Sequence, residues 1–153
     1  MDVTAYHGEL TRAHWDLLLK ADPNFDVVLA YTPPQHGEAE VFTIGKPKEP
    51  YAMCVTVPIK GGFEIKNIST SVMMRRHGMA SALIHHFVEL AREREVECVE
   101  IGTSTTSRDQ IRLYEKLGFK QDGILRDYFL SYPEPIIENG LLARDMVMLR
   151  LNL

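Results

Sequence analysis

The spacing of apolar positions changes along this chain, and each spacing predicts a different kind of element. Near the N-terminus, an apolar stripe at helical spacing predicts a helix over residues 11–19, with Thr11 as its N-cap. Pro23 is suited to open a second helix that runs to about Tyr31. The apolar run 27–29 inside that segment suits a strand equally well, so both interpretations stay open.

Three strands are predicted next, because apolar and polar residues alternate and Gly-containing turns separate the segments. They form an antiparallel meander and cover 39–44, 51–58 and 62–70. In the third strand, Phe63 and Ile65 share one face, but the next apolar residue, Ile68, has the opposite parity. A β-bulge would explain this shift and would leave backbone groups free for a ligand. Burial of the strand on both faces would explain it without a ligand.

After the meander the apolar period becomes helical and predicts a long amphipathic helix over 78–94. An apolar strand at 98–102 follows, so that strand, helix and strand form a right-handed parallel crossover. Ser107 stands at capping-box spacing from Gln110 and begins another helix, which Gly118 ends. A final strand pair is predicted over 119–130 and 142–151. Together these elements indicate a mixed α/β sheet.

The composition is that of one soluble domain covering residues 1–153. Of the 153 residues, 45% are hydrophobic and 25% are charged, which allows a core without a metal or a disulfide framework. Cys54 and Cys98 lie far apart in apolar segments, which favours reduced thiols and a cytoplasmic location. The net charge of -4 gives no support for nucleic acid or anionic lipid as a partner, and no apolar run is long enough to span a bilayer.

The segment 75–80, with the sequence Arg-Arg-His-Gly-Met-Ala, opens the long predicted helix and is a candidate anion site. A helix N-terminus presents unsatisfied N–H groups and about half a positive charge, and Gly78 would let backbone approach an anion closely. The guanidinium groups of Arg75 and Arg76 can each make two contacts to phosphate oxygens. A solvated basic turn, in which Gly78 merely allows the bend, is the alternative interpretation.

With the motif at 113–119, Leu-Tyr-Glu-Lys-Leu-Gly-Phe, the pattern over residues 39–130 resembles the GNAT superfamily of acyl-coenzyme-A-dependent N-acyltransferases. The resemblance implies a mostly antiparallel sheet of six to seven strands with a central, splayed parallel pair and about four flanking helices. It also implies acetyl-CoA as co-substrate, no metal, an amine acceptor and, because dimers are common in the family, a homodimer.

The same resemblance implies a set of cofactor-binding residues. The end of the third meander strand would pair with the acetyl carbonyl and the pantetheine arm, and the start of the long helix would bind the pyrophosphate through its N–H groups. Ser107 stands where the family often has an Asn that contacts the arm. In full, the expected set is Ile68, Ser69, Thr70, Arg75, Arg76, His77, Gly78, Met79, Ala80, Ser81, Ser107 and Tyr114.

Two proton transfers call for catalytic residues. Tyr114 matches the family's general acid, although a phenol pKa of about 10 against a thiol pKa of about 8.5 makes its transfer uphill by roughly 2 kcal/mol. A core aromatic on an apolar stripe is the alternative interpretation. Releasing a proton from an ammonium with a pKa of about 10.4 at pH 7 costs about 4 to 5 kcal/mol. Glu64, expected to face away from Phe63 and Ile65, is the first candidate base, and a solvated surface carboxylate is the alternative.

Two further segments that contain carboxylates are candidates for the acceptor side. Asp127 and Tyr128, near the end of a predicted strand, are second candidates, and Glu134 and Glu138 would attract a cationic substrate or simply belong to a polar loop. The sequence thus predicts direct transfer of an acetyl group from acetyl-CoA to a primary amine of a small molecule or peptide. A non-catalytic acyl-CoA-binding regulatory module, or an interaction domain that binds no cofactor, would leave the same pattern.

Overall fold

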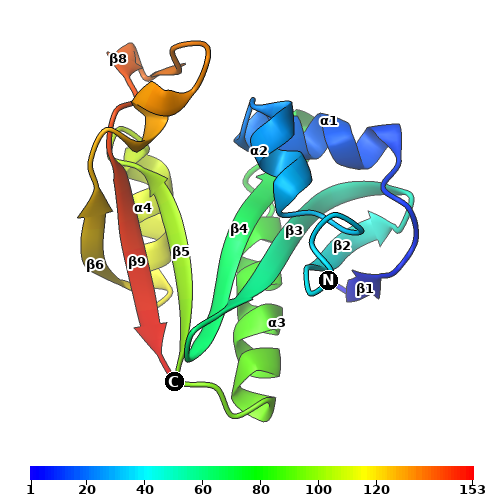
Figure 1. The fold of residues 1–153 in the computed structure, drawn as a ribbon. Helices are drawn as coiled ribbons and strands as arrows, with labels where there is room; N and C mark the ends of the chain where they lie inside the picture. The colour runs from blue at the N-terminus through cyan, green and yellow to red at the C-terminus, as the bar shows by residue number, and fades with distance from the viewer. The chain divides into compact units, whose positions relative to one another are not determined.

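The computed structural model describes all 153 residues, which divide into two compact units, residues 1–96 and 97–153 (Figure 1). None of the helices combines the length and the apolar character needed to cross a membrane. The single domain predicted over 1–153 stays a prediction.

The first unit contains an antiparallel four-stranded sheet with helices on both faces (Figure 1). Its strands lie in the order in which they follow one another: β1 (Val3–Tyr6), β2 (Glu40–Lys46), β3 (Glu49–Ile59) and β4 (Gly62–Thr70). Its helices are α1 (Arg12–Ala21), α2 (Phe25–Ala30) and α3 (Met79–Glu93). The predicted meander and long helix are confirmed, and β1 was not predicted.

Helices α1 and α2 cover one face of this sheet, and α3 covers the other. Leu17 and Leu18 of α1 pack with Val55 and Val57 of β3 in one buried cluster. On the opposite face, the Phe87 ring of α3 lies 5.5 Å from the Phe42 ring and 5.4 Å from the Phe63 ring. Complete burial of a Leu or Phe side chain contributes roughly 2 to 3 kcal/mol. Burial of Leu17 and Leu18 therefore stabilises the packing on one face of the sheet, and burial of Phe87 stabilises it on the other.

The two N-terminal helices owe their starts to side-chain caps. Thr11 caps α1 as predicted, and the N–H of Thr11 donates to Nδ1 of His14 at 2.9 Å, which completes a capping box with an unexpected histidine. The segment that suited helix and strand equally is a helix, because Asn24 Oδ1 accepts from the N–H of Val27 at 3.0 Å. A satisfied N-cap contributes about 1 kcal/mol, which outweighs the strand preference of Val27 and its neighbours.

The second unit contains a three-stranded antiparallel sheet in which β9 lies between β5 and β6 (Figure 1). Its main elements are β5 (Cys98–Ser104), α4 (Arg108–Lys116), β6 (Lys120–Leu125) and β9 (Met146–Asn152). A small hairpin, β7 (Ile137–Glu138) with β8 (Leu141–Leu142), precedes β9. The predicted final strand pair is confirmed as β6 and β9.

Two parts of that final pair were predicted wrongly. The predicted strand 119–130 ends at Leu125, because Asp127 has a left-handed backbone with φ 57° and a 3-10 turn over Tyr128–Ser131 follows. The predicted strand 142–151 begins only at Met146, since Leu142 pairs instead within the small hairpin.

Candidate active site

The turn between β4 and α3 contains two left-handed residues. Arg76 has φ 64° and Gly78 has φ 76°, and α3 begins directly afterwards at Met79. A left-handed conformation costs about 1 to 2 kcal/mol for a residue other than Gly. Arg76 bears this cost on an exposed turn, where packing does not require it.

His77 braces this turn with its ring. Its Nδ1 lies 2.8 Å from the carbonyl oxygen of Arg75 and 3.2 Å from that of Met74. Because carbonyl oxygens only accept, Nδ1 carries the hydrogen and donates it. The described role of His77 is therefore to hold the turn, and its predicted contact with the cofactor stays a prediction.

The start of α3 has backbone donors without helical partners. Gly78 is the N-cap, no side chain caps the helix, and no acidic residue stands in its first turn. The first helical bond runs from the N–H of Ala82 to the carbonyl of Gly78 at 3.0 Å, which leaves the N–H groups of Met79, Ala80 and Ser81 outside the helical ladder. A Cβ placed on Gly78 would meet nothing within 4 Å, so the space beside these groups is open.

Two arginines, Arg75 and Arg76, directly precede these donors in the sequence. Arg75 and Arg76 are exposed, and neither forms an ion pair with another residue. Unpaired guanidinium groups in the same turn as open N–H groups match the charge of a diphosphate, which carries several anionic oxygens. This turn is therefore suited to hold an anion, and the predicted binding of a cofactor diphosphate here stays a prediction.

The predicted bulge is present in β4. Val55 of β3 is opposite Asn67, but the next residue, Thr56, is opposite Ile65, so that Lys66 is the extra residue. The shift places Ile68 on the face of Ile65 again, which explains the apparent change of parity. Beyond the bulge, Ile68, Ser69 and Thr70 pair with β3, and their predicted contacts to the cofactor stay predictions.

Glu64 lies on the predicted face of β4. It is directly opposite Val57, which packs under α1 and α2, whereas the Phe63 ring packs on α3. Its side chain is only 17% exposed, and Oε2 lies 3.5 Å from Nζ of Lys66. Glu64 is thus a half-buried, ion-paired carboxylate rather than a solvated one, and its role as a base stays a prediction.

Sequence reasoning missed Asn67, which is 4% exposed in the interior of β4. Its Nδ2 donates to the carbonyl of Leu18 at 3.1 Å and to the hydroxyl of Tyr31 at 2.9 Å. That hydroxyl donates in turn to Oδ2 of Asp22 at 3.4 Å. The signal in the sequence was a single amide residue among apolar ones. The Asn67 side chain links α1 and the end of α2 to the strand that also carries Glu64.

In the second unit, Ser107 is the N-cap of α4 as predicted, but the predicted side-chain cap is absent. Its Oγ donates instead to the Glu138 carboxylate, at 2.7 Å from Oε1 and 2.8 Å from Oε2. A hydrogen bond to a carboxylate is stronger than one between neutral groups, which explains why the hydroxyl turns away from the helix. Ser107 is 4% exposed.

Tyr114 is buried on α4, with its ring 6.4 Å from that of Phe119. Burial, and secondly the negative charge of Glu138, raise the pKa of the Tyr114 phenol above its ordinary value. A phenol with a raised pKa is a weaker proton donor, so transfer to a thiolate is more uphill than the roughly 2 kcal/mol of an unperturbed pair.

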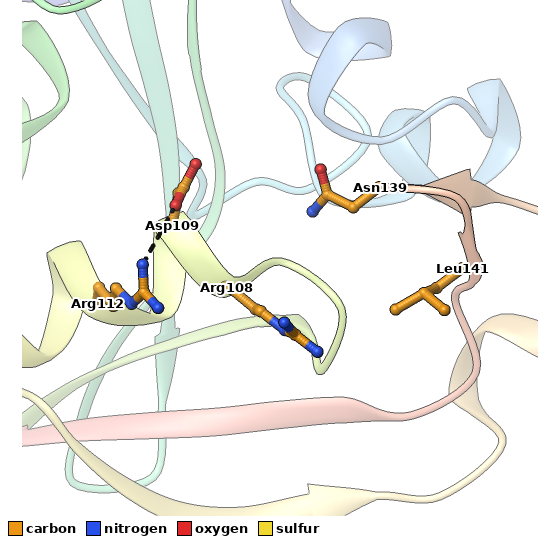
Figure 2. A pocket seen from close by; sticks show the side chains of 5 residues that line it. All are labelled: Arg108, Asp109, Arg112, Asn139 and Leu141. Atoms are coloured by element: carbon orange, nitrogen blue, oxygen red, sulfur yellow. Dashed lines mark ion pairs between the residues drawn. The ribbon is translucent and has the colours of Figure 1, made fainter.

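The small hairpin lies against the start of α4. Asn139 Nδ2 donates to the carbonyl of Thr106 at 3.0 Å. A cavity of about 390 Å³ lies beside this contact, and its lining residues come from α4 and from the hairpin (Figure 2): Arg108, Asp109, Arg112, Asn139 and Leu141. Arg112 and Asp109 form an ion pair at 3.9 Å across the first turn of α4.

The second candidates for the acceptor side do not lie in a strand. The Asp127 carboxylate accepts from Nε of Arg144 at 2.7 Å, and the Asp127 N–H donates to Oδ1 of Asp145 at 2.8 Å. Tyr128 begins the 3-10 turn that follows. Because Asp127 is occupied by a guanidinium, it is a structural link at this turn, and an acceptor-side role for both residues stays a prediction.

Comparison with known proteins places this fold and sequence. Residues 15–119 match the Acetyltransferase (GNAT) family. The N-acetyltransferase YvbK of Bacillus subtilis (strain 168) is 37% identical over 141 residues, which are 91% of this chain and 88% of that protein.

Two solved structures extend the likeness over nearly the whole chain. A GNAT family acetyltransferase from Elizabethkingia anophelis with acetyl-CoA bound is 30% identical, with a TM-score of 0.87 over 99% of this chain and 98% of that one. A Bacillus subtilis acetyltransferase in complex with CoA is 34% identical, with a TM-score of 0.85 over 99% of both chains. The predicted mixed α/β, mostly antiparallel fold class is thereby confirmed.

Proposed function

We propose that this chain, which belongs to the GNAT family of acetyltransferases, transfers an acetyl group from acetyl-CoA to a primary amine. Family membership confirms the predicted resemblance and the predicted class of enzyme. The observation that carries the proposal is the open start of α3, where free N–H groups adjoin the unpaired Arg75 and Arg76. The relatives solved with acetyl-CoA and with CoA support acetyl-CoA as the co-substrate of this chain.

The cofactor's diphosphate is assigned to the turn before α3. The N–H groups from Gly78 to Ser81 would hold its oxygens, and Arg75 and Arg76 would neutralise the remaining charge. The acetyl-bearing arm is assigned to the strand end Ile68–Thr70 and to Ser107. Both arginines bring one positive charge, and Arg76 has in addition a left-handed backbone that packing does not explain.

The chemistry needs no covalent acyl-enzyme. The amine nitrogen attacks the thioester carbon, the carbon–sulfur bond breaks, and the products are an amide and the CoA thiol. A backbone N–H near Ser69 or Thr70 is assigned to the developing oxyanion. Tyr114 is assigned to the sulfur as a proton donor whose contribution is small, because its pKa is raised.

The amine must lose a proton before or during attack. Glu64 is assigned as the group that accepts this proton, directly or through water, and the ammonium of Lys66 at 3.5 Å lies beside its carboxylate. The hydrogen bonds from Asn67 to the Leu18 carbonyl and to the Tyr31 hydroxyl hold α1 and α2 on the same face of the sheet as Glu64. The acceptor class is a primary amine on a small molecule or a peptide.

We further propose a cytoplasmic homodimer. The buried thiol of Cys54, with a pKa raised to about 12 by burial, fits a protein whose cysteines stay reduced, as in the cytoplasm.

The edge of the sheet in the second unit supports the homodimer. Strand β6 pairs only with β9 in the second unit and carries the exposed Ile124 and Leu125, at 49% and 45% exposure. An apolar edge of this kind is suited to pair with a second copy.

An amine screen tests the proposed function. Purified protein is supplied with acetyl-CoA and a panel of primary amines, and release of free thiol is followed together with the mass of the acetylated product. We expect amine-dependent thiol release, and Glu64→Gln should lower the rate and alter its pH profile with the best amine. Cofactor binding without thiol release for any amine would favour a regulatory module, and no CoA binding at millimolar concentration would overturn the proposal.

A further inference from the structure

We propose that Glu138 is a positioning residue for cofactor binding, which fixes the Ser107 hydroxyl so that its oxygen can only accept a hydrogen bond from the cofactor's arm. The inference deepens the proposed function and rests on it. It concerns a residue outside the motif of α4 that carries the family resemblance, because Glu138 lies 31 positions beyond Ser107 in the chain.

The geometry fixes the direction of the bond. Ser107 Oγ lies within 2.7 Å and 2.8 Å of both oxygens of the Glu138 carboxylate. An ionised carboxylate has no hydrogen to give, and a serine hydroxyl has only one. The hydroxyl hydrogen of Ser107 is therefore directed at Glu138, and only the lone pairs of its oxygen are left for a ligand.

The hairpin keeps Glu138 in this position. Asn139 and Gly140, with φ 54° and 74°, form a two-residue turn of the type that two left-handed residues favour. The hairpin is closed by the N–H of Ala143, which donates to the carbonyl of Ile136 at 2.8 Å. Asn139 Nδ2 fastens the tip of the hairpin to Thr106, the residue before Ser107. Glu138 and Asn139 of the hairpin thus form hydrogen bonds with Ser107 and Thr106, two neighbouring residues at the start of α4.

The fixed direction has a consequence for the ligand. The pantetheine arm of CoA carries amide groups, each with an N–H donor and a carbonyl acceptor. A freely rotating serine could bond to either, but Ser107 can bond only to an N–H while Glu138 holds its hydrogen. Because the carboxylate polarises the hydroxyl, the Ser107 oxygen is also a better acceptor than that of an isolated serine. Ser107 is shorter than the Asn that the family often has at this position. The contact with Glu138 gives its hydroxyl a fixed orientation, which a freely rotating serine lacks.

Calorimetric titration with CoA tests the inference. The proteins compared are wild type, Ser107→Ala, Glu138→Ala, the double variant, and Glu138→Gln, whose amide oxygen still accepts from Ser107. Loss of one neutral hydrogen bond lowers affinity by about fivefold, so Ser107→Ala should weaken CoA binding by about this factor. Glu138→Ala should weaken it by a comparable factor, because the released Ser107 hydroxyl loses both its fixed accepting orientation and its polarisation by the carboxylate. The double variant should bind no more weakly than either single variant, and Glu138→Gln should bind more like wild type than like Glu138→Ala.

Charge and folding are controlled separately. Glu115→Gln removes a negative charge from an exposed position of α4 without touching Ser107, and its CoA affinity should equal that of wild type. Thermal melting of each variant checks that it folds, and the rescue by Glu138→Gln is a result that a purely structural role would not give.

Three results would overturn the inference: unchanged affinity of Glu138→Ala, effects of Ser107→Ala and Glu138→Ala that multiply in the double variant, or a Glu138→Gln variant as weak as Glu138→Ala. Each of these leaves the proposed function intact, because wild type still binds CoA. If wild type itself does not bind CoA, the proposed function fails, and the inference fails with it.

Discussion

The turn before α3 and the start of α4 differ in exposure: the polar groups of the first are exposed and unpaired, and those of the second are buried. In the first, the guanidinium groups of Arg75 and Arg76 are exposed and unpaired, and the nearby N–H groups have no helical partners. In the second, Ser107 and Tyr114 are each 4% exposed, and the Ser107 hydroxyl is already bound to Glu138. The first region is built to attract charge and the second to hold a fixed shape. We therefore expect the largest loss of CoA affinity from substitutions in the first region, and a loss of rate from substitution of Tyr114 in the second.

The largest effect is expected at the exposed region. Replacing both Arg75 and Arg76 by Ala removes two charge-assisted contacts of about 1.5 kcal/mol each, so CoA should bind about 100-fold more weakly by calorimetry. Neither guanidinium forms an ion pair, so the free energy of unfolding in urea should stay the same within about 0.5 kcal/mol.

Arg92→Ala provides the control for that double variant. Arg92 is an exposed arginine in the last turn of α3, where it lies 3.5 Å from Glu89. Its replacement should leave CoA affinity unchanged. An equal loss in both proteins would mean that net charge, rather than the turn, attracts the cofactor.

The next effect is expected at the buried region and in the rate. Tyr114→Phe should lower kcat by about tenfold and by no more than about 10², because a phenol with a raised pKa contributes little as an acid. CoA affinity should change by less than about twofold, since the ring and its packing on Phe119 are retained. Stopped-flow or steady-state thiol release measures the rate. Full activity in Tyr114→Phe would remove the proton-donor role.

A smaller effect concerns the backbone of the exposed turn. Gly78→Ala should lower the free energy of unfolding by about 1 kcal/mol, because Gly78 has φ 76° and an alanine there is strained. It should also weaken CoA binding, since the new Cβ projects into open space beside the N–H groups. Gly123→Ala is the matched control, because its Cβ also meets nothing within 4 Å and its φ is not left-handed. Equal CoA affinity in Gly78→Ala and wild type would contradict a close backbone approach.

The smallest effect lies outside both regions, in the cap of α1. His14 is fully buried, its Nδ1 accepts from the N–H of Thr11, and burial lowers its pKa. Below the ordinary histidine pKa of about 6.5, the unfolded chain binds a proton at His14 that the folded protein does not. Stability should therefore be complete above that pH and fall as the pH is lowered toward the folded pKa.

Urea unfolding at pH 7.5 and pH 5.5 measures this loss, and His14→Gln should reduce the difference between the two. CoA affinity should be unaffected by that substitution, because His14 contacts neither binding region. An unchanged pH dependence in His14→Gln would assign the acid sensitivity to other groups.

Local patterns predicted most of this fold. The long helix, the strand over 62–70 and its bulge were all predictable, because each depends on the period of neighbouring residues. Strand β1 has four residues, the shortest run in which an alternation can be recognised. The hairpin strands have two residues each, although Asn139 and Gly140 between them are a turn signal.

In the candidate site, too, the features formed by neighbouring residues were predictable and those formed by distant residues were not. The turn before α3 was predictable, because its arginines, its glycine and the helix start are consecutive in sequence. The bond between Ser107 and Glu138 was not, because it joins residues 31 positions apart and depends on a hairpin whose strands are too short to show a pattern. Asn67 likewise shows its role only when α1 and α2 lie on the sheet, since its partners Leu18 and Tyr31 are distant in the chain.

Backbone amides at the start of α3 are proposed to hold the cofactor's diphosphate. Titration of isotope-labelled protein with CoA, followed by amide nuclear magnetic resonance, measures this directly. We expect the signals of Gly78, Met79, Ala80 and Ser81 to shift together and to saturate with the calorimetric affinity. Saturable CoA binding that leaves these four amides unmoved would contradict the claim.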